Sequence, residues 1–148
     1  MALLILKSPL MQQRDILKDE IEKISKVLAR LAAKLLGIED DIQFNTIRQQ
    51  TASTLKDELD FDLDELLSLN DVRYMAALQQ LQLGTTYLER LIEILHALGQ
   101  KSNTSIDKLN YHKKALATLN FLEHSTQSTG FVQLQLRGDL EREIEHLE

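Results

Sequence analysis

The sequence LKDEIEKISKVLARLAAKL, residues 17–35, decides the fold. Its large apolar side chains recur at alternating intervals of four and three residues. This is the heptad spacing of a helix that packs along a seam against another helix. The seam consists of Leu17, Ile21, Ile24, Leu28, Leu31 and Leu35. The sequence therefore predicts a long first helix whose apolar stripe faces a neighbouring helix.

Two residues indicate where this helix begins and ends. Pro9 is the only proline in the chain, and proline is tolerated in the first turn of a helix but disrupts its interior. Gly37 follows the stripe, and glycine is common just after the last helical turn. We therefore expect the first helix to start at Pro9. Residues 1–8 would then form an N-terminal arm that packs on the domain or on a neighbouring subunit.

The middle of the chain also repeats apolar residues at helical spacing. A second helix is expected between Ile42 and Leu59, folding back antiparallel to the first. Asp62 and Asn70 are expected to cap two short helices, because Asp and Asn side chains accept hydrogen bonds from the free amides of a first turn. No segment alternates in the strand pattern between turn signals. The sequence therefore predicts an all-α fold.

Further helices are expected from residue 86 onward. Thr86 and Glu89 stand in capping-box spacing at the start of one of them, and Gly99 is expected to end it. Residues 100–105 and 125–130 are rich in polar, turn-forming residues and are expected to be connections. Leucine stripes fill the intervals between them. The chain is therefore expected to form a bundle of about six helices.

Composition limits the class of protein. A chain of 148 residues that is 43% hydrophobic and 27% charged suits one globular domain. There is no cysteine, which excludes disulfides and thiolate metal ligands and fits a reducing compartment. No stretch approaches the length of a membrane span, and the apolar first six residues are too short for a signal segment. We expect a cytoplasmic protein that does not bind membranes.

Charge is unevenly distributed along the chain. The net charge of −6 disfavours binding to nucleic acid, because a negative surface repels phosphates. Residues 10–36 carry a net charge of +2, whereas residues 39–71 carry −8. A basic helix next to an acidic segment indicates complementarity within the chain or within a dimer.

Several stretches together resemble a family of small, uncharacterised all-helical bacterial proteins. The N-terminal ones are RDIL, IEKI, VLARL and ELDFDLDELL, at residues 14–17, 21–24, 27–31 and 58–67. The stretches KKAL and LNFL, residues 113–116 and 119–122, are similar to that family's C-terminal hairpin, which looks like a tetratricopeptide (TPR) unit. The resemblance implies a single domain with a long helical hairpin at residues 9–60 and TPR-like helices at residues 61–148. It implies no particular activity.

The TPR comparison extends to one or two hairpins at most. No 34-residue period recurs three times, and the Trp, Gly and Pro positions of the consensus repeat are not filled.

Two Glu-x-x-His pairs raise the alternative of a metal-dependent bundle. They are Glu93 with His96 and Glu143 with His146, and such pairs supply inward-facing ligands in di-iron bundles. The apolar stripe of its helix places Glu93 on the opposite face, and His146 lies close to the end of the sequence. We therefore interpret both pairs as solvated side chains and predict no metal or cofactor.

Two other patterns have simpler explanations. Asp60, Asp62 and Asp64 alternate as in a calcium loop, but Glu65 stands where the sharp turn of that loop needs glycine. Helix capping explains these carboxylates. His112 stands beside lysines as in a phosphotransfer helix, but the leucine stripe places it at the core edge, where a hydrogen-bonded, buried imidazole is the commoner role.

These observations predict a non-enzymatic interaction or scaffold protein that binds through helix surfaces. The partner would be a protein or peptide, including a second copy of the chain as a homodimer. Five seam residues form the predicted interface, with the alternative that they belong to the chain's own core: Leu17, Ile21, Ile24, Leu28 and Leu31.

Overall fold

The fold is an all-α bundle, seen in a computed structural model that describes residues 2–126 and 131–148. Side chains are described for residues 17–126 and 133–148. The described residues form seven helices and no strand. The helices are α1 (Ala2–Leu36), α2 (Asp41–Leu59), α3 (Leu63–Leu67), α4 (Asp71–Leu81), α5 (Thr85–Lys101), α6 (Ser105–Thr126) and α7 (Phe131–Leu147).

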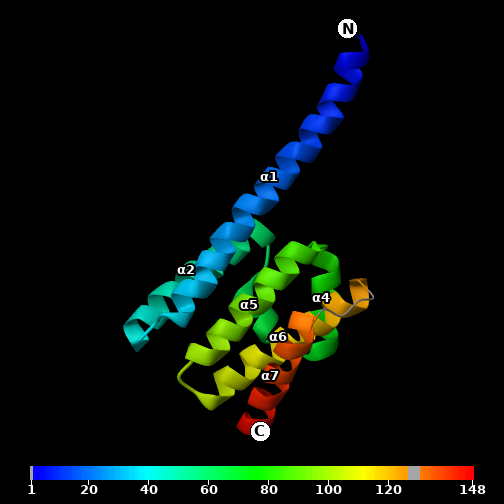
Figure 1. The fold of residues 1–148 in the computed structure, drawn as a ribbon. Helices are drawn as coiled ribbons and strands as arrows, with labels where there is room; N and C mark the ends of the chain where they lie inside the picture. The colour runs from blue at the N-terminus through cyan, green and yellow to red at the C-terminus, as the bar shows by residue number, and fades with distance from the viewer. Residues whose placement is uncertain (1, 127–130) are drawn as a thin grey trace.

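Helix α1 is the longest element and extends well past the rest of the molecule (Figure 1). Its start corrects the expectation that the helix begins at Pro9, because helical backbone already begins at Ala2. The residues before Pro9 are mainly Ala, Leu and Ile. Ala and Leu are strong helix formers, so the helix continues through proline despite the loss of one backbone hydrogen bond. Residues 2–8 are thus the first turns of α1.

Helix α2 folds back along α1, which gives the long N-terminal helical hairpin (Figure 1). The stripe of α1, however, makes its most extensive contacts with α5. Heptad spacing indicates that a helix has a partner, and it does not indicate which one. The sequence predicts the second helix as the partner within the chain, whereas the structure shows that α5 is the main partner.

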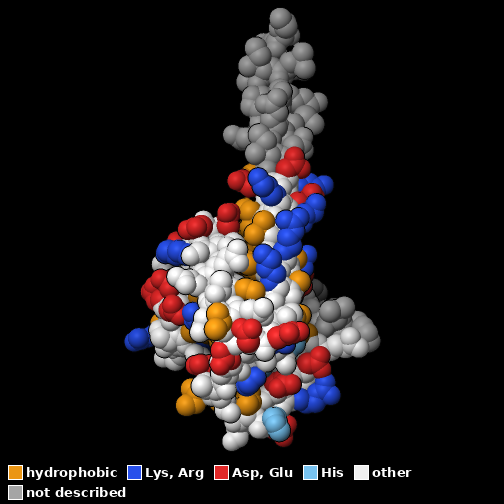
Figure 2. Space-filling model, turned by 90° about the vertical axis from the view of Figure 1, so that its left-hand side faces the viewer, with side chains coloured by type: hydrophobic (Ala, Val, Ile, Leu, Met, Phe, Trp, Pro, Cys, Tyr) orange, Lys and Arg blue, Asp and Glu red, His pale blue; other side chains and the backbone are white. Residues whose placement is uncertain are grey.

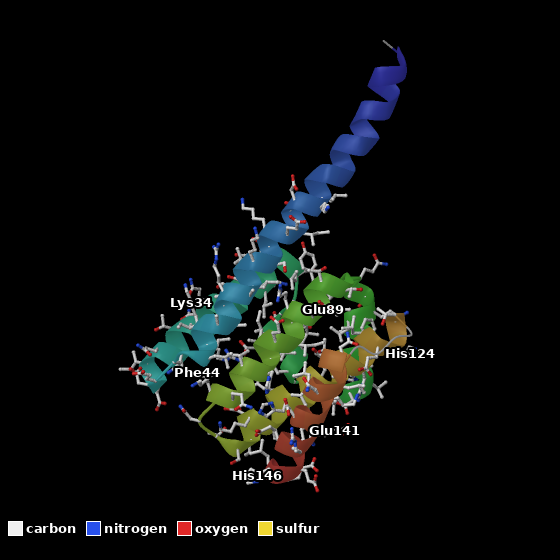
Figure 3. The ribbon with its side chains drawn as sticks, in the orientation of Figure 1. Lys34, Phe44, Glu89, His124, Glu141 and His146 are labelled. Carbon is white, nitrogen blue, oxygen red and sulfur yellow. The ribbon has the colours of Figure 1, made fainter. Side chains whose placement is uncertain are left out.

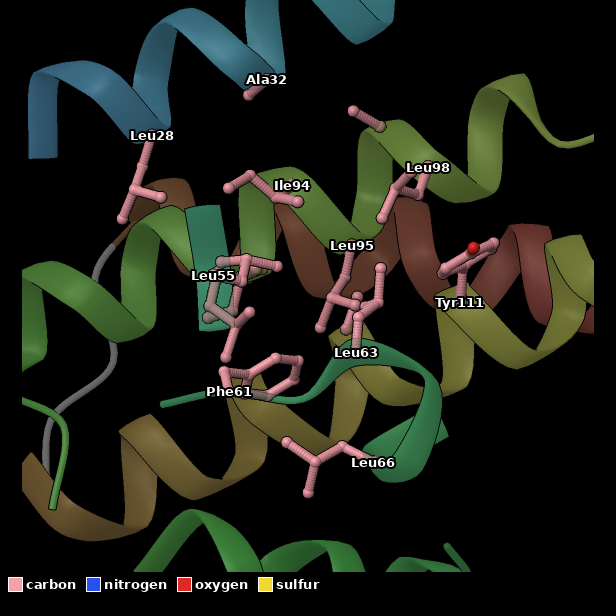
Figure 4. Close-up of a cluster of buried hydrophobic side chains, with 14 of the residues drawn as sticks. Leu28, Ala32, Leu55, Phe61, Leu63, Leu66, Ile94, Leu95, Leu98 and Tyr111 are labelled. Atoms are coloured by element: carbon pink, nitrogen blue, oxygen red, sulfur yellow. The ribbon is translucent and has the colours of Figure 1, made fainter. Parts of the chain in front are cut away.

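The core lies between α1, α2 and the antiparallel α5–α6 hairpin. In Figure 4, Leu28 and Ala32 of α1 lie over Ile94 of α5, with Leu55 and Phe61 beyond them. Helix α5 is buried over much of its surface: eight of its residues are buried, among them both Leu91 and Leu95. Helix α7 covers the outer side of α6. The α5–α6 hairpin therefore forms the body that α1 rests on.

Several of the predicted helix ends are confirmed. Backbone NH of Gly37 bonds to carbonyls in the last turn of α1. The Asp62 carboxylate accepts a hydrogen bond from Glu65 N at 3.2 Å, capping α3. Asn70 caps α4 in the same way through Arg73 N at 2.9 Å. Local side-chain chemistry was sufficient to locate these boundaries.

Three other boundaries differ from expectation. The residue that precedes α5 is Gly84, with no side-chain cap, so Thr86 already lies inside the first turn. Gly99 is buried within α5, which ends at Lys101. Helix α6 runs to Thr126, so the expected turn at residues 125–130 begins inside that helix, and residues 127–130 lie outside the described residues.

None of the helices in the described ranges is both long and apolar enough to cross a bilayer.

Candidate interaction surface

The seam of α1 divides into a covered part and an uncovered part. Leu28 and Leu31 are buried in the chain's own core, at 0% and 4% exposure. Ile24 is half-buried and packs at the edge of that core. Leu17 and Ile21 are exposed, at 57% and 37%. The five predicted interface residues therefore do not share one environment, and only the first two present substantial apolar surface.

Leu17 and Ile21 border a groove between α1 and the start of α5. The groove has a volume of about 600 Å³, and most of its exposed lining is apolar. Thr86 and Arg90 form its wall on α5. Ser25 forms part of its lining on α1 and is itself buried. A concave, mainly apolar surface next to exposed Leu and Ile side chains is suited to binding another apolar side chain.

Arg90 joins the two walls of the groove. Its Nε donates to Ser25 Oγ at 2.8 Å, and its Nη1 donates to both carboxylate oxygens of Glu93 at 3.0 Å. The guanidinium group thus links α1 to α5 where the body begins to cover the seam. These hydrogen bonds restrict rotation of the Arg90 side chain, so its position in the wall of the groove is fixed.

Charged residues border the groove on α1. Lys18, Glu22 and Lys26 all line it. In Figure 2, hydrophobic side chains lie beside a row of Lys and Arg side chains that follows α1. An apolar groove with a charged border is typical of a surface that binds another protein.

Sequence reasoning missed Thr86 and Arg90 as parts of this surface. They stand more than fifty residues after the end of the seam, and no local pattern connects them with α1. The arginine at position 90 gave no signal in the sequence, because only the fold places its half-buried side chain against Ser25.

The two Glu-x-x-His pairs do not form one site. Glu93 faces outward and pairs with Arg90. His96, Glu143 and His146 line a separate polar hollow between α5 and α7, and Figure 3 shows His146 near the end of α7. No cluster of His, Asp and Glu side chains that could hold a metal ion forms within the described part of the chain.

His112 is buried, as the leucine stripe predicted, but it is not hydrogen-bonded. It is 1% exposed, and neither ring nitrogen has a partner among the described residues. Its ring packs against Gly99 and lies 5.6 Å from the His96 ring, centroid to centroid. Burial lowers the pKa of His112 to about 4, and the nearby His96 acts in the same direction. The imidazole is therefore a neutral packing group, inaccessible to a phosphate donor.

The alternating aspartates have separate structural roles. Asp60 ends α2 in the left-handed conformation and pairs with Lys56. Asp62 caps α3, and Asp64 pairs with Arg48 at 2.7 Å. Arg48 Nε also donates to Tyr111 Oη at 2.6 Å, which ties α2 to α6 beside a second, more polar hollow. Each of these three carboxylates has a different partner in the fold, so they do not converge on one cation.

The fold and this surface define a small helical bundle with one protruding helix and an apolar groove at its base. No family model, curated protein or solved structure matches the chain.

Proposed function

We propose that this chain is a non-enzymatic interaction protein that binds a helical partner through the protruding part of α1. The observation that carries the proposal is the change of environment along one apolar stripe. Leu28 is completely covered by the chain's own body, whereas Leu17, on the same stripe, is 57% exposed beside a groove. A helix that continues its apolar stripe beyond its own core has a surface suited to another helix.

The shape of the groove supports the same proposal. Helix-binding grooves receive apolar anchors spaced three or four residues apart. Leu17 and Ile21 lie one helical turn apart along the groove, so they can contact successive anchors of such a helix, and Thr86 of α5 extends the surface to the side. We also propose that the α5–α6 hairpin corresponds to the TPR-like hairpin of the family that the sequence resembles.

A capture experiment tests the proposal. The tagged full chain is used as bait, with an untagged copy and a cell lysate as prey. The double substitution of Leu17→Glu with Ile21→Glu places two carboxylates on the stripe, and we expect it to abolish capture. Val72→Glu is the matched control, because Val72 is 81% exposed on α4, away from the groove. Circular dichroism checks that both variants remain helical.

Two results would contradict the proposal. Equal capture by wild type, the double variant and the control would show that α1 is not the binding surface. Stoichiometric iron, manganese or zinc in the purified chain would instead favour the metal-dependent bundle.

A further inference from the structure

We infer that the helical partner is a second copy of this chain, and that the two α1 helices pair antiparallel along their protruding parts. This inference rests on the proposed function and specifies its partner. It follows from the heptad register of the sequence, from where α5 covers the seam, and from the distribution of charge along α1.

Two seam residues that are buried in the core define the heptad register. Leu28 is buried in the seam at heptad position a, and Leu31 is buried at position d. Counting back in sevens assigns Leu3, Leu10 and Leu17 to position d, and Lys7, Arg14 and Ile21 to position a. Helical backbone spans this whole stretch. The protruding part therefore has leucine at every d position and mixed residues at a.

An antiparallel pair arranges these positions favourably. In such pairs each a residue lies opposite a d residue of the other helix. Setting Leu17 opposite Lys7 of the second copy also sets Ile21 opposite Leu3 and Arg14 opposite Leu10. A lysine or arginine stem can cover a leucine while its charged end reaches solvent. In a parallel pair, each Lys7 would face Lys7 of the other copy, and each Arg14 would face another Arg14, which is repulsive.

The position of the body favours the same orientation. A parallel partner would continue along the seam from Leu17 toward Leu28, where α5 already covers the stripe. An antiparallel partner runs the other way. Its first helical turn reaches Ile21, beside the groove formed with Thr86 and Arg90. Helix α1 projects away from the body at this point (Figure 1), which leaves room for a second helix.

The distribution of charge along α1 also favours the antiparallel orientation. Residues 1–13 contain one basic and no acidic side chain, whereas residues 14–22 contain two basic and four acidic ones. Antiparallel pairing places the positive stretch of each copy against the negative stretch of the other. Complementary charge of this kind selects partner and orientation.

Thiol cross-linking tests the orientation, because the chain has no cysteine of its own. Lys7→Cys and Leu17→Cys variants of the full chain are mixed and treated with a short bifunctional thiol reagent. The antiparallel register places these two positions opposite each other, so we expect a cross-linked dimer. Leu17→Cys alone should not cross-link to itself, because its two copies would be separated by ten residues along the helix, about 15 Å.

Val72→Cys, exposed on α4, is the control for random collision. Light scattering before cross-linking should give twice the 17.0 kDa mass of one chain for wild type and for both cysteine variants.

Each opposing result has a defined meaning. Efficient cross-linking of Leu17→Cys to itself would indicate parallel pairing and overturn the inference. A wild-type mass of one chain at all concentrations would also overturn it. If the chain is monomeric but still captures another protein, and the substitutions Leu17→Glu and Ile21→Glu abolish that capture, the proposed function stands while this inference fails.

Discussion

The two ends of one apolar stripe, on a single helix, lie in opposite environments. Around Leu28 and Leu35 the stripe of α1 is fully enclosed, with both side chains at 0% exposure. Around Leu17 and Ile21 the same heptad pattern faces a groove that is open to solvent. The two regions cannot be told apart by sequence spacing. The difference arises because α5 covers α1 only from the turn of Ser25 and Arg90 onward.

This difference separates stability from binding. Buried apolar area contributes to the folding of the single chain, at about 25 cal/mol per Å². Exposed apolar area contributes only when a partner covers it. Matched substitutions in the two regions should therefore give very different results, and the following predictions use that contrast.

The largest expected effect is in the covered region. Leu28→Ala removes a completely buried side chain and leaves a cavity between α1 and α5. Substitutions of this kind cost about 2–5 kcal/mol, so we expect the free energy of unfolding to fall by that amount. Urea denaturation followed by circular dichroism measures it. A loss below about 1 kcal/mol would mean that α5 does not hold the seam in solution.

Acidification should weaken the body that covers the seam. The folded-state pKa of His112 is about 4, below its ordinary value of 6.5, so the unfolded chain binds a proton more readily. The contribution of neutral His112 to the free energy of unfolding is therefore fully present above about pH 6.5 and decreases as the pH falls toward 4. The groups near the imidazole are His96 of α5, Lys108 of α6 and Glu143 of α7.

We expect a loss of about 3 kcal/mol across that pH range. Urea unfolding of wild type at a series of pH values measures it. His112→Leu is the comparison, because it removes the titrating group and should flatten the profile. Burial lowers the pKa of His96 too, so a smaller slope of the same sign should persist. Identical profiles for both proteins would contradict the assignment to His112.

Two glycines provide a smaller contrast within the body. A Cβ at Gly99 would lie 2.6 Å from His112 Cε1, whereas a Cβ at Gly138 would meet nothing within 4 Å. Gly99→Ala should therefore push α5 away from α6 and destabilise the fold by about 1–3 kcal/mol. Gly138→Ala should stabilise α7 by up to about 1 kcal/mol, because alanine favours helix. Thermal unfolding of both variants checks the opposite signs, and equal shifts would contradict the close packing at Gly99.

Local signals predicted local structure well. The heptad spacing predicted the long first helix, and Asp62 and Asn70 capped the helices expected of them. Features that depend on distant residues were missed. Gly99 suggests a helix end in the sequence, but it lies inside α5, where the His112 ring leaves no room for a Cβ. Likewise, the α5 wall of the groove comes from Thr86 and Arg90, which meet α1 only in the folded chain.

The smallest expected effect is in the uncovered region, and it should depend on protein concentration. Leu17→Ala makes the same chemical change as Leu28→Ala, at a position that is 57% exposed. In dilute protein we expect a change within about 0.5 kcal/mol, as for surface substitutions generally. At high concentration, self-association stabilises the folded chain by mass action, so the wild type should gain more stability than Leu17→Ala does. Unfolding at two concentrations a hundredfold apart measures this gap. A gap that is equally small at both concentrations would mean that Leu17 contributes nothing to self-association, and the contrast between the two ends of α1 would then concern folding alone.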